Sequence, residues 1–348
     1  MKIGIVGAGI TGMASAYYLS KIGHEVTVFD ERPVTGGLAR NFEFYENTSL
    51  EIHPILLSKS DSHLIELLAE FDLQNQIIWK NVRTGVFSSE QLLPFTNIMD
   101  LYRFPGLNFI NKTKSAVAAL KIIMTQNWEK MDKLPAKEWI IRNCGAKTYE
   151  NIWQNLLECR FKGYAHAAPT AWFWAMAKKR VSCSSRLGMS QTAGYFQESV
   201  KIIFDSLNRS ITRNGGSVLT GHKVTKIDIN SNKARGLTAN DKYFKFDRII
   251  LTVPVNEIKQ IAKEAFVSLP EKIRQLEYAT ASTLILELKR QFSEYFKLKI
   301  LDSGIPFCEI VEPANMRGQK FFRNRTVIYI PNYIRETGRL INLDKQSL

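Results

Sequence analysis

Residues 1–40 read MKIGIVGAGITGMASAYYLSKIGHEVTVFDERPVTGGLAR, and this stretch decides the fold. Residues 3–6 predict a short buried strand, and the turn Gly7-Ala8-Gly9-Ile10-Thr11-Gly12 follows it directly. Residues 13–22 carry apolar side chains at helical spacing, and residues 25–29 alternate as a second strand. A strand, a G-x-G-x-x-G turn and a helix in this order predict a βαβ unit whose turn binds the diphosphate of a dinucleotide.

The glycines of this turn have different roles. Gly7 allows the sharp turn, Gly9 lets phosphate approach the backbone because it has no Cβ, and Gly12 lets the helix pack closely on its strand. Backbone amides and the helix N-terminus then favour an anion. The residues of the turn that we expect to bind the diphosphate are Gly7, Ala8, Gly9, Ile10, Thr11 and Gly12.

The second predicted strand ends in two acidic residues, Asp30 and Glu31. A carboxylate about 20 residues beyond the glycines accepts hydrogen bonds from the ribose hydroxyls of adenosine and repels a 2′-phosphate. Asp30 is the first candidate for this role and Glu31 is the second. A βαβ unit without a ligand is the alternative, and the in-register turn, helix and acid disfavour it.

Residues 30–40, DERPVTGGLAR, add a second pair of glycines and a basic residue. This pattern resembles the extended nucleotide fingerprint of the flavin-dependent amine oxidase, protoporphyrinogen oxidase and phytoene desaturase superfamily. The resemblance implies FAD as the cofactor, with the second glycine pair and the following arginine at its pyrophosphate and ribityl side. It also implies that a later strand contacts the adenine through its backbone. The additional FAD contacts implied in this way are Gly36, Gly37, Leu38, Ala39, Arg40 and Val224. An ordinary solvated loop is the alternative for the second glycine pair.

The resemblance covers nearly the whole chain and is nearest to bacterial protoporphyrinogen-oxidase-like proteins. It implies an α/β fold, with a Rossmann-like FAD-binding domain of the glutathione-reductase type and an inserted α+β substrate domain. Beyond residue 40 the matches are moderate, and they lie at residues 156–161, 171–174, 194–196, 246–254 and 305–307. We expect the FAD-binding domain at 1–60 and 193–272, a helical substrate or cap region at 61–192, and substrate-domain strands at 273–348.

Apolar periodicity predicts the remaining elements. Helices are expected at 64–71, 107–128, 136–142, 149–158, 171–179 and 197–213. Strands are expected at 217–220, 223–229, 233–239, 242–246, 248–253, 282–289 and 326–330.

The C-terminal end departs from the family pattern. Relatives continue past the strand that corresponds to residues 326–330 into another glycine motif, whose backbone approaches the flavin ring. Nothing after Tyr333 resembles that motif. We therefore expect a shortened enclosure of the flavin, with both FAD affinity and turnover impaired. The alternative is a branch of the family in which other residues close the site.

The resemblance implies hydride transfer from an apolar or amine-type small molecule to flavin N5, with the cofactor carrying the chemistry. No catalytic residue is assigned, because Arg160 and Lys162 are better explained as rim or ion-pair residues. A non-redox flavoenzyme of the sugar-nucleotide mutase type and a catalytically silent nucleotide-binding protein are the alternatives. An NAD-dependent dehydrogenase is disfavoured by the second glycine pair and the inserted helical region.

Aromatic side chains of the middle region are candidates for an apolar substrate cavity, although aromatics on helices are more often core residues. They are Trp153, Trp172, Phe173, Trp174, Tyr195 and Phe196. A porphyrinogen, a polyene, an amine and a sugar nucleotide all remain open as substrates.

The formal net charge of +14 comes from Lys and Arg spread along the whole chain. We therefore predict a generally basic surface and no nucleic-acid partner. The alternative is peripheral contact with anionic lipids through residues 107–128, where lysines interrupt an apolar helical stretch. No run reaches the roughly 18 apolar residues of a membrane span. Because a strand begins at residue 3, we expect no secretion signal and a cytoplasmic protein, with any membrane contact at the inner face.

The cysteines lie far apart, without C-x-x-C spacing, at Cys144, Cys159, Cys183 and Cys308. This spacing predicts reduced, mostly buried thiols and no metal site.

Overall fold

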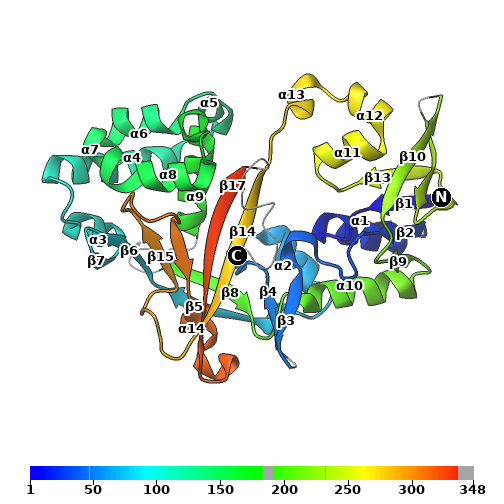
Figure 1. Cartoon of the computed structure of the whole chain (residues 1–348), viewed down its shortest axis with the longest axis horizontal. Coiled ribbons are helices and arrows are strands. Elements are labelled where there is room, and N and C mark those ends of the chain that lie inside the picture. Colours follow the sequence, from blue (N-terminus) through cyan, green and yellow to red (C-terminus); the bar gives the residue numbers. More distant parts are fainter. Residues whose placement is uncertain (47, 183–190, 232, 336–348) are drawn as a thin grey trace. The chain divides into compact units, whose positions relative to one another are not determined.

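The computed structural model describes residues 1–46, 48–182, 191–231 and 233–335, and Figure 1 shows its helices and strands. The chain forms two compact units. Unit 1 comprises residues 1–55, 68–73 and 198–277, and unit 2 comprises residues 56–67, 74–197 and those from 278 onward. Each unit is therefore assembled from segments that are far apart in the sequence.

The centre of unit 1 is a parallel sheet with the strand order β13-β1-β2-β9. Its strands are β1 (Lys2–Val6), β2 (Glu25–Phe29), β9 (Ser217–Leu219) and β13 (Arg248–Leu251). The helix α1 (Ile10–Lys21) connects β1 to β2, and α10 (Lys201–Arg213) leads into β9. The apolar run of β1 is buried from Ile3 onward, as expected for a parallel strand that is covered on both faces. This is the Rossmann-like arrangement that the sequence predicts.

The remainder of unit 1 is an antiparallel sheet, short strands and short helices. The sheet has the order β10-β11-β12, and one hydrophobic cluster joins its Leu237 to Phe29 of β2 and Phe246. The strands are β3 (Asn41–Tyr45), β4 (Thr48–Glu51), β10 (Val224–Asn230), β11 (Lys233–Ala239) and β12 (Lys242–Lys245). The helices are α11 (Val255–Ile261), α12 (Lys263–Ser268) and α13 (Glu271–Arg274). The predicted β11 and β12 hairpin is confirmed.

Unit 2 contains a six-stranded sheet of order β14-β17-β16-β15-β6-β7, in which only the β15 and β6 pair is parallel. Its strands are β6 (Thr84–Ser88), β7 (Gln91–Pro94), β14 (Ala279–Leu288), β15 (Lys297–Ile300), β16 (Glu309–Val311) and β17 (Thr326–Arg335). A separate antiparallel pair is formed by β5 (Ile77–Val82) and β8 (Gln191–Phe196). The predicted strands at 282–289 and 326–330 are confirmed as β14 and β17, and they pair with each other.

The helices of unit 2 enclose a core rich in aromatic side chains, which includes Trp139, Phe173 and the partly buried Trp153. Local capping defines some of their starts: the Asn97 side chain accepts from Asp100 N, and the Asp100 side chain accepts from Asn97 N. The helices are α3 (Ile98–Arg103), α4 (Phe109–Met124), α5 (Trp128–Asp132), α6 (Ala136–Cys144), α7 (Ala146–Thr148), α8 (Gln154–Phe161), α9 (Thr170–Ser182) and α14 (Ala314–Arg317). A π-helical turn, η3 (Tyr149–Trp153), precedes α8, and α2 (Ser62–Ala69) has residues in both units. The predicted helices at 136–142 and 171–179 are confirmed, whereas the one predicted at 107–128 ends at Met124 and the one predicted at 149–158 starts with the π-helical turn.

Two predicted elements differ in the structure. The segment 61–192, predicted to be helical, also contains β5, β6, β7 and the first residues of β8. The β6–β7 turn has positive φ at both Ser89 and Glu90, so it is a tight hairpin turn that lacks the usual Asn-Gly signal. The helix predicted from residue 197 begins only at Lys201, because Gln191–Phe196 pairs with β5 as a strand. That pairing is non-local, and neither strand alone reveals it.

The Glu70 side chain in unit 1 binds three side chains of α1. Its carboxylate accepts from the hydroxyls of Tyr17 at 2.7 Å and Tyr18 at 2.8 Å, and it pairs with Lys21. Hydrogen bonds from Lys21, Tyr17 and Tyr18 lower the pKa of Glu70 from 4.5 to about 2. Because the pKa is lower in the folded state, the contribution to stability is present above about pH 4.5 and is lost as the pH falls through about 2.

We expect Glu70→Gln to lower the free energy of unfolding by about 1 kcal/mol at neutral pH, since solvent screens this partly exposed side chain. Urea unfolding at pH 7 and at pH 3 measures the effect, and the difference from the parent should be smaller at pH 3. The control is Glu66→Gln, because Glu66 is exposed and pairs only with the exposed His63 among the described residues. An equal loss at both pH values would contradict the assignment.

Candidate nucleotide-binding site

The turn after β1 requires glycine at two positions for the fold itself. Gly7 has a φ of +108°, and a Cβ there would lie 2.6 Å from Thr252 Oγ1. A Cβ on Gly12 would lie 1.9 Å from Gly7 O, so only glycine lets α1 approach the end of β1. Thr252 reinforces the turn, because its hydroxyl is placed to donate to Val6 O at 2.9 Å and Gly7 O at 3.1 Å.

Gly9 is different, because the fold alone does not require glycine there. Its φ is −74°, and the nearest atom to a Cβ added at this position would be Gly37 Cα at 3.9 Å. No side chain caps α1, and its first turn contains no acidic residue. The N–H groups at the start of α1 therefore lie beside open space that suits a diphosphate.

Asp30 lies at the end of β2 and faces the same turn. Its Oδ2 accepts from Ala8 N at 2.8 Å, and its Oδ1 accepts from Arg32 N at 2.9 Å. Each carboxylate oxygen has a second lone pair that can accept from a sugar hydroxyl. Glu31 is exposed, and its carboxylate lies 3.9 Å from Lys223 Nζ. The structure therefore places Asp30, rather than Glu31, against the glycine turn.

The second glycine pair lies directly on the first turn. Gly36 N donates to Ala8 O at 2.9 Å, and Gly36 forms a parallel bridge with Gly9. A Cβ on Gly37 would lie 3.0 Å from Gly9 Cα, and Gly37 has a φ of +56°. The two glycine motifs thus form one cradle, in which a side chain at Gly37 would press against Gly9.

The edge of this cradle carries one apolar and one basic side chain. Leu38 is 88% exposed, so its side chain is available for a ligand. Arg40 donates from Nη1 to Gly37 O at 3.0 Å, and burial lowers the pKa of its guanidinium. Val224 begins β10, where it is buried and pairs with Ala239 beside a bulge. All the residues that the sequence predicts for the nucleotide lie in unit 1.

The candidate aromatic residues of unit 2 lie mainly in its core. Trp153, Trp172, Phe173 and Trp174 belong to the helical cluster around Trp139. Tyr195 and Phe196 are buried on β8, where the Tyr195 hydroxyl donates to Met316 O at 2.6 Å. These aromatic side chains are core residues, as the preferred interpretation of the sequence holds.

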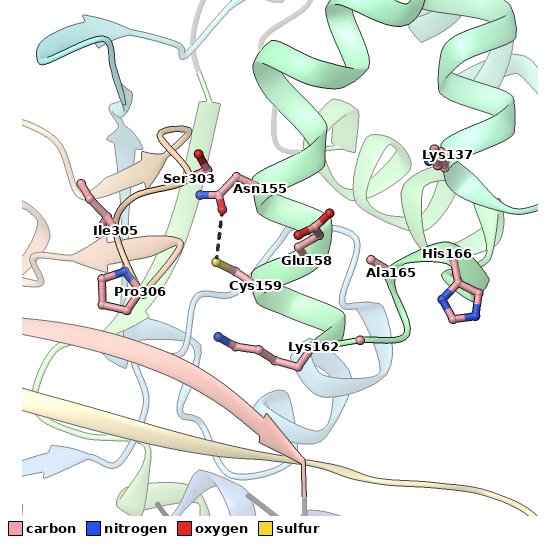
Figure 2. A pocket seen from close by; sticks show the side chains of 11 residues that line it. Lys137, Asn155, Glu158, Cys159, Lys162, Ala165, His166, Ser303, Ile305 and Pro306 are labelled. Carbon is pink, nitrogen blue, oxygen red and sulfur yellow. Dashed lines mark hydrogen bonds between the residues drawn. The ribbon is translucent and has the colours of Figure 1, made fainter. Parts of the chain in front are cut away.

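Unit 2 contains a hollow of about 500 Å³ beside α8, and it is largely polar (Figure 2). Its wall is made of Lys137, Asn155, Glu158, Cys159, Lys162, Gly163, Ala165, His166, Ser303, Ile305 and Pro306. Lys162 belongs to this wall, whereas the Arg160 guanidinium donates to the Tyr333 hydroxyl and lies 4.5 Å from the centre of its ring. Arg160 therefore contacts Tyr333 of β17 through both a hydrogen bond and a cation–π interaction, and the ion pair expected from the sequence is not its contact here.

Sequence reasoning missed two groups. Thr252 follows β13 within a segment that the sequence predicts only as a strand, so nothing marks its hydroxyl. Lys299 of β15 lies 6.0 Å from the Trp153 ring centre, and burial, with Arg180 and Lys297 adding to it, lowers its pKa to about 8. Lys299 is half-buried, and its alternating position in the strand gives no sign of these neighbours.

Among the residues that the structure describes, no group of three or more His, Cys, Asp or Glu side chains is arranged to hold a metal ion. Cys144, Cys159 and Cys308 are buried free thiols, as predicted, and Cys183 lies outside the described residues. Within the described ranges, no helix is both long and apolar enough to cross a membrane.

Comparisons with known proteins agree with this geometry. A D-amino acid dehydrogenase of Paramagnetospirillum magneticum is 58% identical over 36 residues, which are 10% of this chain and only 8% of that protein. The structure of a putative protoporphyrinogen oxidase from Exiguobacterium sp. 255-15 has a TM-score of 0.74 at 15% identity, covering 99% of this chain and 80% of that one. The structure of an oxidoreductase from Methanosarcina mazei has a TM-score of 0.72 at 19% identity, covering 97% of this chain and 80% of that one. These two structures confirm the predicted fold.

A family model described as flavin containing amine oxidoreductase matches residues 10–319. That range includes the helix N-terminus at Ile10, Asp30 and the second glycine pair. The cradle fits the expected cofactor, because Gly9 leaves space beside unpaired helix-start amides. FAD is accordingly the cofactor, and the chain belongs to the flavin-containing amine oxidoreductases.

Proposed function

We propose that this protein is an FAD-dependent oxidoreductase that transfers a hydride from an apolar or amine-type small molecule to flavin N5. The observation that carries the proposal is the cradle in which Gly36 and Gly37 lie on the Gly9 turn. A simple βαβ unit does not need that second glycine pair. Family membership supports redox chemistry for the bound flavin.

Each part of the cradle has a proposed role toward FAD. The turn residues Gly7, Ala8, Gly9, Ile10, Thr11 and Gly12 hold the diphosphate at the N-terminus of α1. Gly7 N and Ala8 N donate to Phe29 O and Asp30, so these two residues shape the turn, and the later amides face the phosphates. Asp30 accepts from the ribose hydroxyls, and Glu31 contributes negative charge nearby. Gly36, Gly37, Leu38, Ala39 and Arg40 contact the pyrophosphate and ribityl side, and the backbone at Val224 contacts the adenine. FAD, when bound, would supply the hydride acceptor. These residues would fix the position of the cofactor and provide the electrostatic environment around it.

Unit 1 is the proposed FAD-binding part, and unit 2 the proposed substrate part. The sequence-based division places the FAD-binding segments at 1–60 and 193–272 and the substrate segments at 61–192 and 273–348. The units have somewhat different boundaries, with unit 1 formed by residues 1–55, 68–73 and 198–277. The amine class is favoured over the other substrates by the family match.

The experiment is anaerobic flavin reduction. Purified protein should carry FAD, identified after release, and a panel of amines and amino acids should bleach its flavin absorbance, with oxygen restoring it. A flavin that no substrate reduces, together with turnover of a sugar nucleotide, would instead indicate a mutase. Protein without any flavin after reconstitution would indicate a silent nucleotide-binding protein and would overturn the proposal.

We propose a peripheral membrane contact for α4, in a protein located in the cytoplasm. Apolar side chains between 59% and 76% exposed follow this helix, and the exposed Lys114 and Lys121 lie among them. They are Phe109, Ile110, Val117, Leu120 and Met124. An exposed apolar stripe with flanking lysines suits the headgroup region of an anionic membrane.

Leu120→Glu is expected to weaken binding to vesicles that contain phosphatidylserine by about tenfold or more, since burying a leucine contributes about 1.5–3 kcal/mol. Vesicle co-sedimentation measures the change. Val267→Glu is the matched control, because Val267 is 61% exposed on α12 of unit 1. Equal losses in both variants, or no binding by the parent, would contradict the contact.

A further inference from the structure

Two thiols of unit 2 meet beside the hollow of Figure 2. Cys159 lies on α8 and forms part of the hollow's wall, and Cys308 directly precedes β16. Both are free and buried, and they belong to the same hydrophobic cluster. The loop that carries Ser303, Ile305 and Pro306 lines the hollow just before Cys308. The FAD cradle, which lies in unit 1, does not involve either cysteine.

A chain of hydrogen bonds fixes these thiols relative to each other. Cys159 Sγ donates to Asn155 Oδ1 at 3.7 Å, as the dashed line in Figure 2 shows. Asn155 Nδ2 donates to Ile300 O at 3.1 Å, and Ile300 N donates to Cys308 O at 2.9 Å. Both side chains pack in one buried cluster, and each changes the pKa of the other. The two thiols are therefore neighbours, with Cys159 carried by α8 and Cys308 held by β15.

The surroundings give the two thiols different roles. The neighbouring Cys308 thiol lowers the pKa of the Cys159 thiol, and the nearby Lys162 cation lowers it as well, against the opposing effects of burial and Glu158. The Cys159 thiol in turn raises the pKa of Cys308, and burial adds to that increase. Cys144 has no such partner thiol among the described residues, and burial raises its pKa to about 11. The thiolate, which is the reactive form, is thus favoured at Cys159.

We propose that Cys159 and Cys308 form a dithiol site that reacts with hydrogen peroxide and small organic hydroperoxides to give a reversible disulfide. The Cys159 thiolate attacks the peroxide, so an S–O bond forms as the O–O bond breaks, and the departing alkoxide or hydroxide takes up a proton. The Cys308 sulfur then attacks Cys159 Sγ, an S–S bond forms, and the S–O bond breaks. The leaving hydroxide takes the Cys308 proton and becomes water, so two thiols lose two electrons to the peroxide.

This disulfide would tie α8 covalently to the segment that leads into β16. Because Asn155 and the 303–306 loop share the wall of the hollow with Cys159, oxidation would fix the shape of that wall. A disulfide needs a sulfur separation of about 2.05 Å, so the two thiols must approach each other when they are oxidised.

The experiment uses the full chain with Cys183→Ser, which leaves Cys144, Cys159 and Cys308 as its thiols. Folded protein is treated with stoichiometric hydrogen peroxide, and free thiols are counted over time. Peptides are then mapped by mass spectrometry without reduction. We expect two thiols to disappear, a cross-linked Cys159–Cys308 peptide to appear and dithiothreitol to reverse both changes.

Variants separate the two roles. Cys308→Ser should give no disulfide and should accumulate a Cys159 sulfenic acid that dimedone traps. Lys162→Gln should slow the loss of thiols by about threefold to tenfold. Removal of the cation raises the pKa of the Cys159 thiol by a small amount, so less of the reactive thiolate is present. Cys144→Ser is the matched control and should react like its parent. The same treatment in urea should remove the preference for Cys159.

A cross-link that includes Cys144, or retention of reduced Cys159 in folded protein while Cys144 oxidises, would overturn the proposal. The peptide mapping uses the Cys183→Ser protein, in which both Cys159 and Cys308 are present. A site variant that folds poorly therefore cannot prevent detection of the Cys159–Cys308 disulfide. The reaction is expected with and without bound FAD. Its failure would therefore leave the proposed function untouched.

Discussion

Gly9→Ala is expected to remove FAD from the protein while leaving the fold intact. A Cβ at this position meets no protein atom closer than 3.9 Å, and the backbone is in a region open to any residue. The added methyl group would instead occupy the space beside the N-terminus of α1. We expect the dissociation constant of FAD to rise by about a hundredfold, which corresponds to roughly 2.7 kcal/mol.

The measurement is the flavin content of purified protein, followed by titration of the flavin-free form with FAD. Urea unfolding of the flavin-free variant should agree with that of the flavin-free parent within about 1 kcal/mol. Gly304→Ala is the matched control, since a Cβ there meets no atom within 4 Å and the residue lies outside the cradle. Normal FAD affinity in Gly9→Ala would refute the proposed position of the diphosphate.

Gly12 shows why the choice of glycine matters. Its Cβ would lie 1.9 Å from Gly7 O, so Gly12→Ala would disturb the packing of α1 on β1 whether or not FAD binds. Loss of FAD in that variant would be explained by the fold alone. The open position at Gly9 is therefore the more informative one to substitute.

The nucleotide unit could be predicted from the sequence because its determinants are local. β1, the glycine turn, α1 and β2 follow one another within the first 29 residues, and each has its own pattern. The contact of Gly36 with Ala8 joins segments that are still close in the sequence. Family resemblance added the expectation that this second glycine pair serves the same ligand.

The remainder depends on contacts between distant residues, which single-segment patterns do not encode. The pairing of β5 with β8 joins residues 77–82 to residues 191–196. Because apolar periodicity does not show this pairing, it predicts that the helix after β8 starts at residue 197, four residues before α10 begins. Cys159 and Cys308 are predicted as separate buried thiols, because no spacing rule brings them together. Glu70 binds the side chains of Tyr17, Tyr18 and Lys21 of α1, which lie about 50 residues earlier in the sequence, so no local pattern indicates these contacts.

Asp30 and Glu31 are adjacent acids, and the structure gives them different environments. Asp30 faces Ala8 in the glycine turn, whereas Glu31 is exposed and lies 3.9 Å from Lys223. In Asp30→Asn, only one oxygen remains to serve two backbone donors and a ribose hydroxyl. Because hydrogen bonds to a charged group contribute about 1.5–3 kcal/mol, we expect FAD binding to weaken by about tenfold to a hundredfold.

Glu31→Gln is the matched substitution, and it should change the dissociation constant by less than about threefold, since exposed ion pairs contribute little. Titration of flavin-free protein with FAD and with ADP compares the two variants. Because ADP carries the ribose and diphosphate without the flavin, it should lose affinity in Asp30→Asn by the same factor as FAD. A larger loss in Glu31→Gln, or a loss for FAD that ADP does not share, would remove Asp30 from the ribose. The ribose would then have to bind at the exposed Glu31 carboxylate, whereas in the structure it is Asp30 that faces the glycine turn.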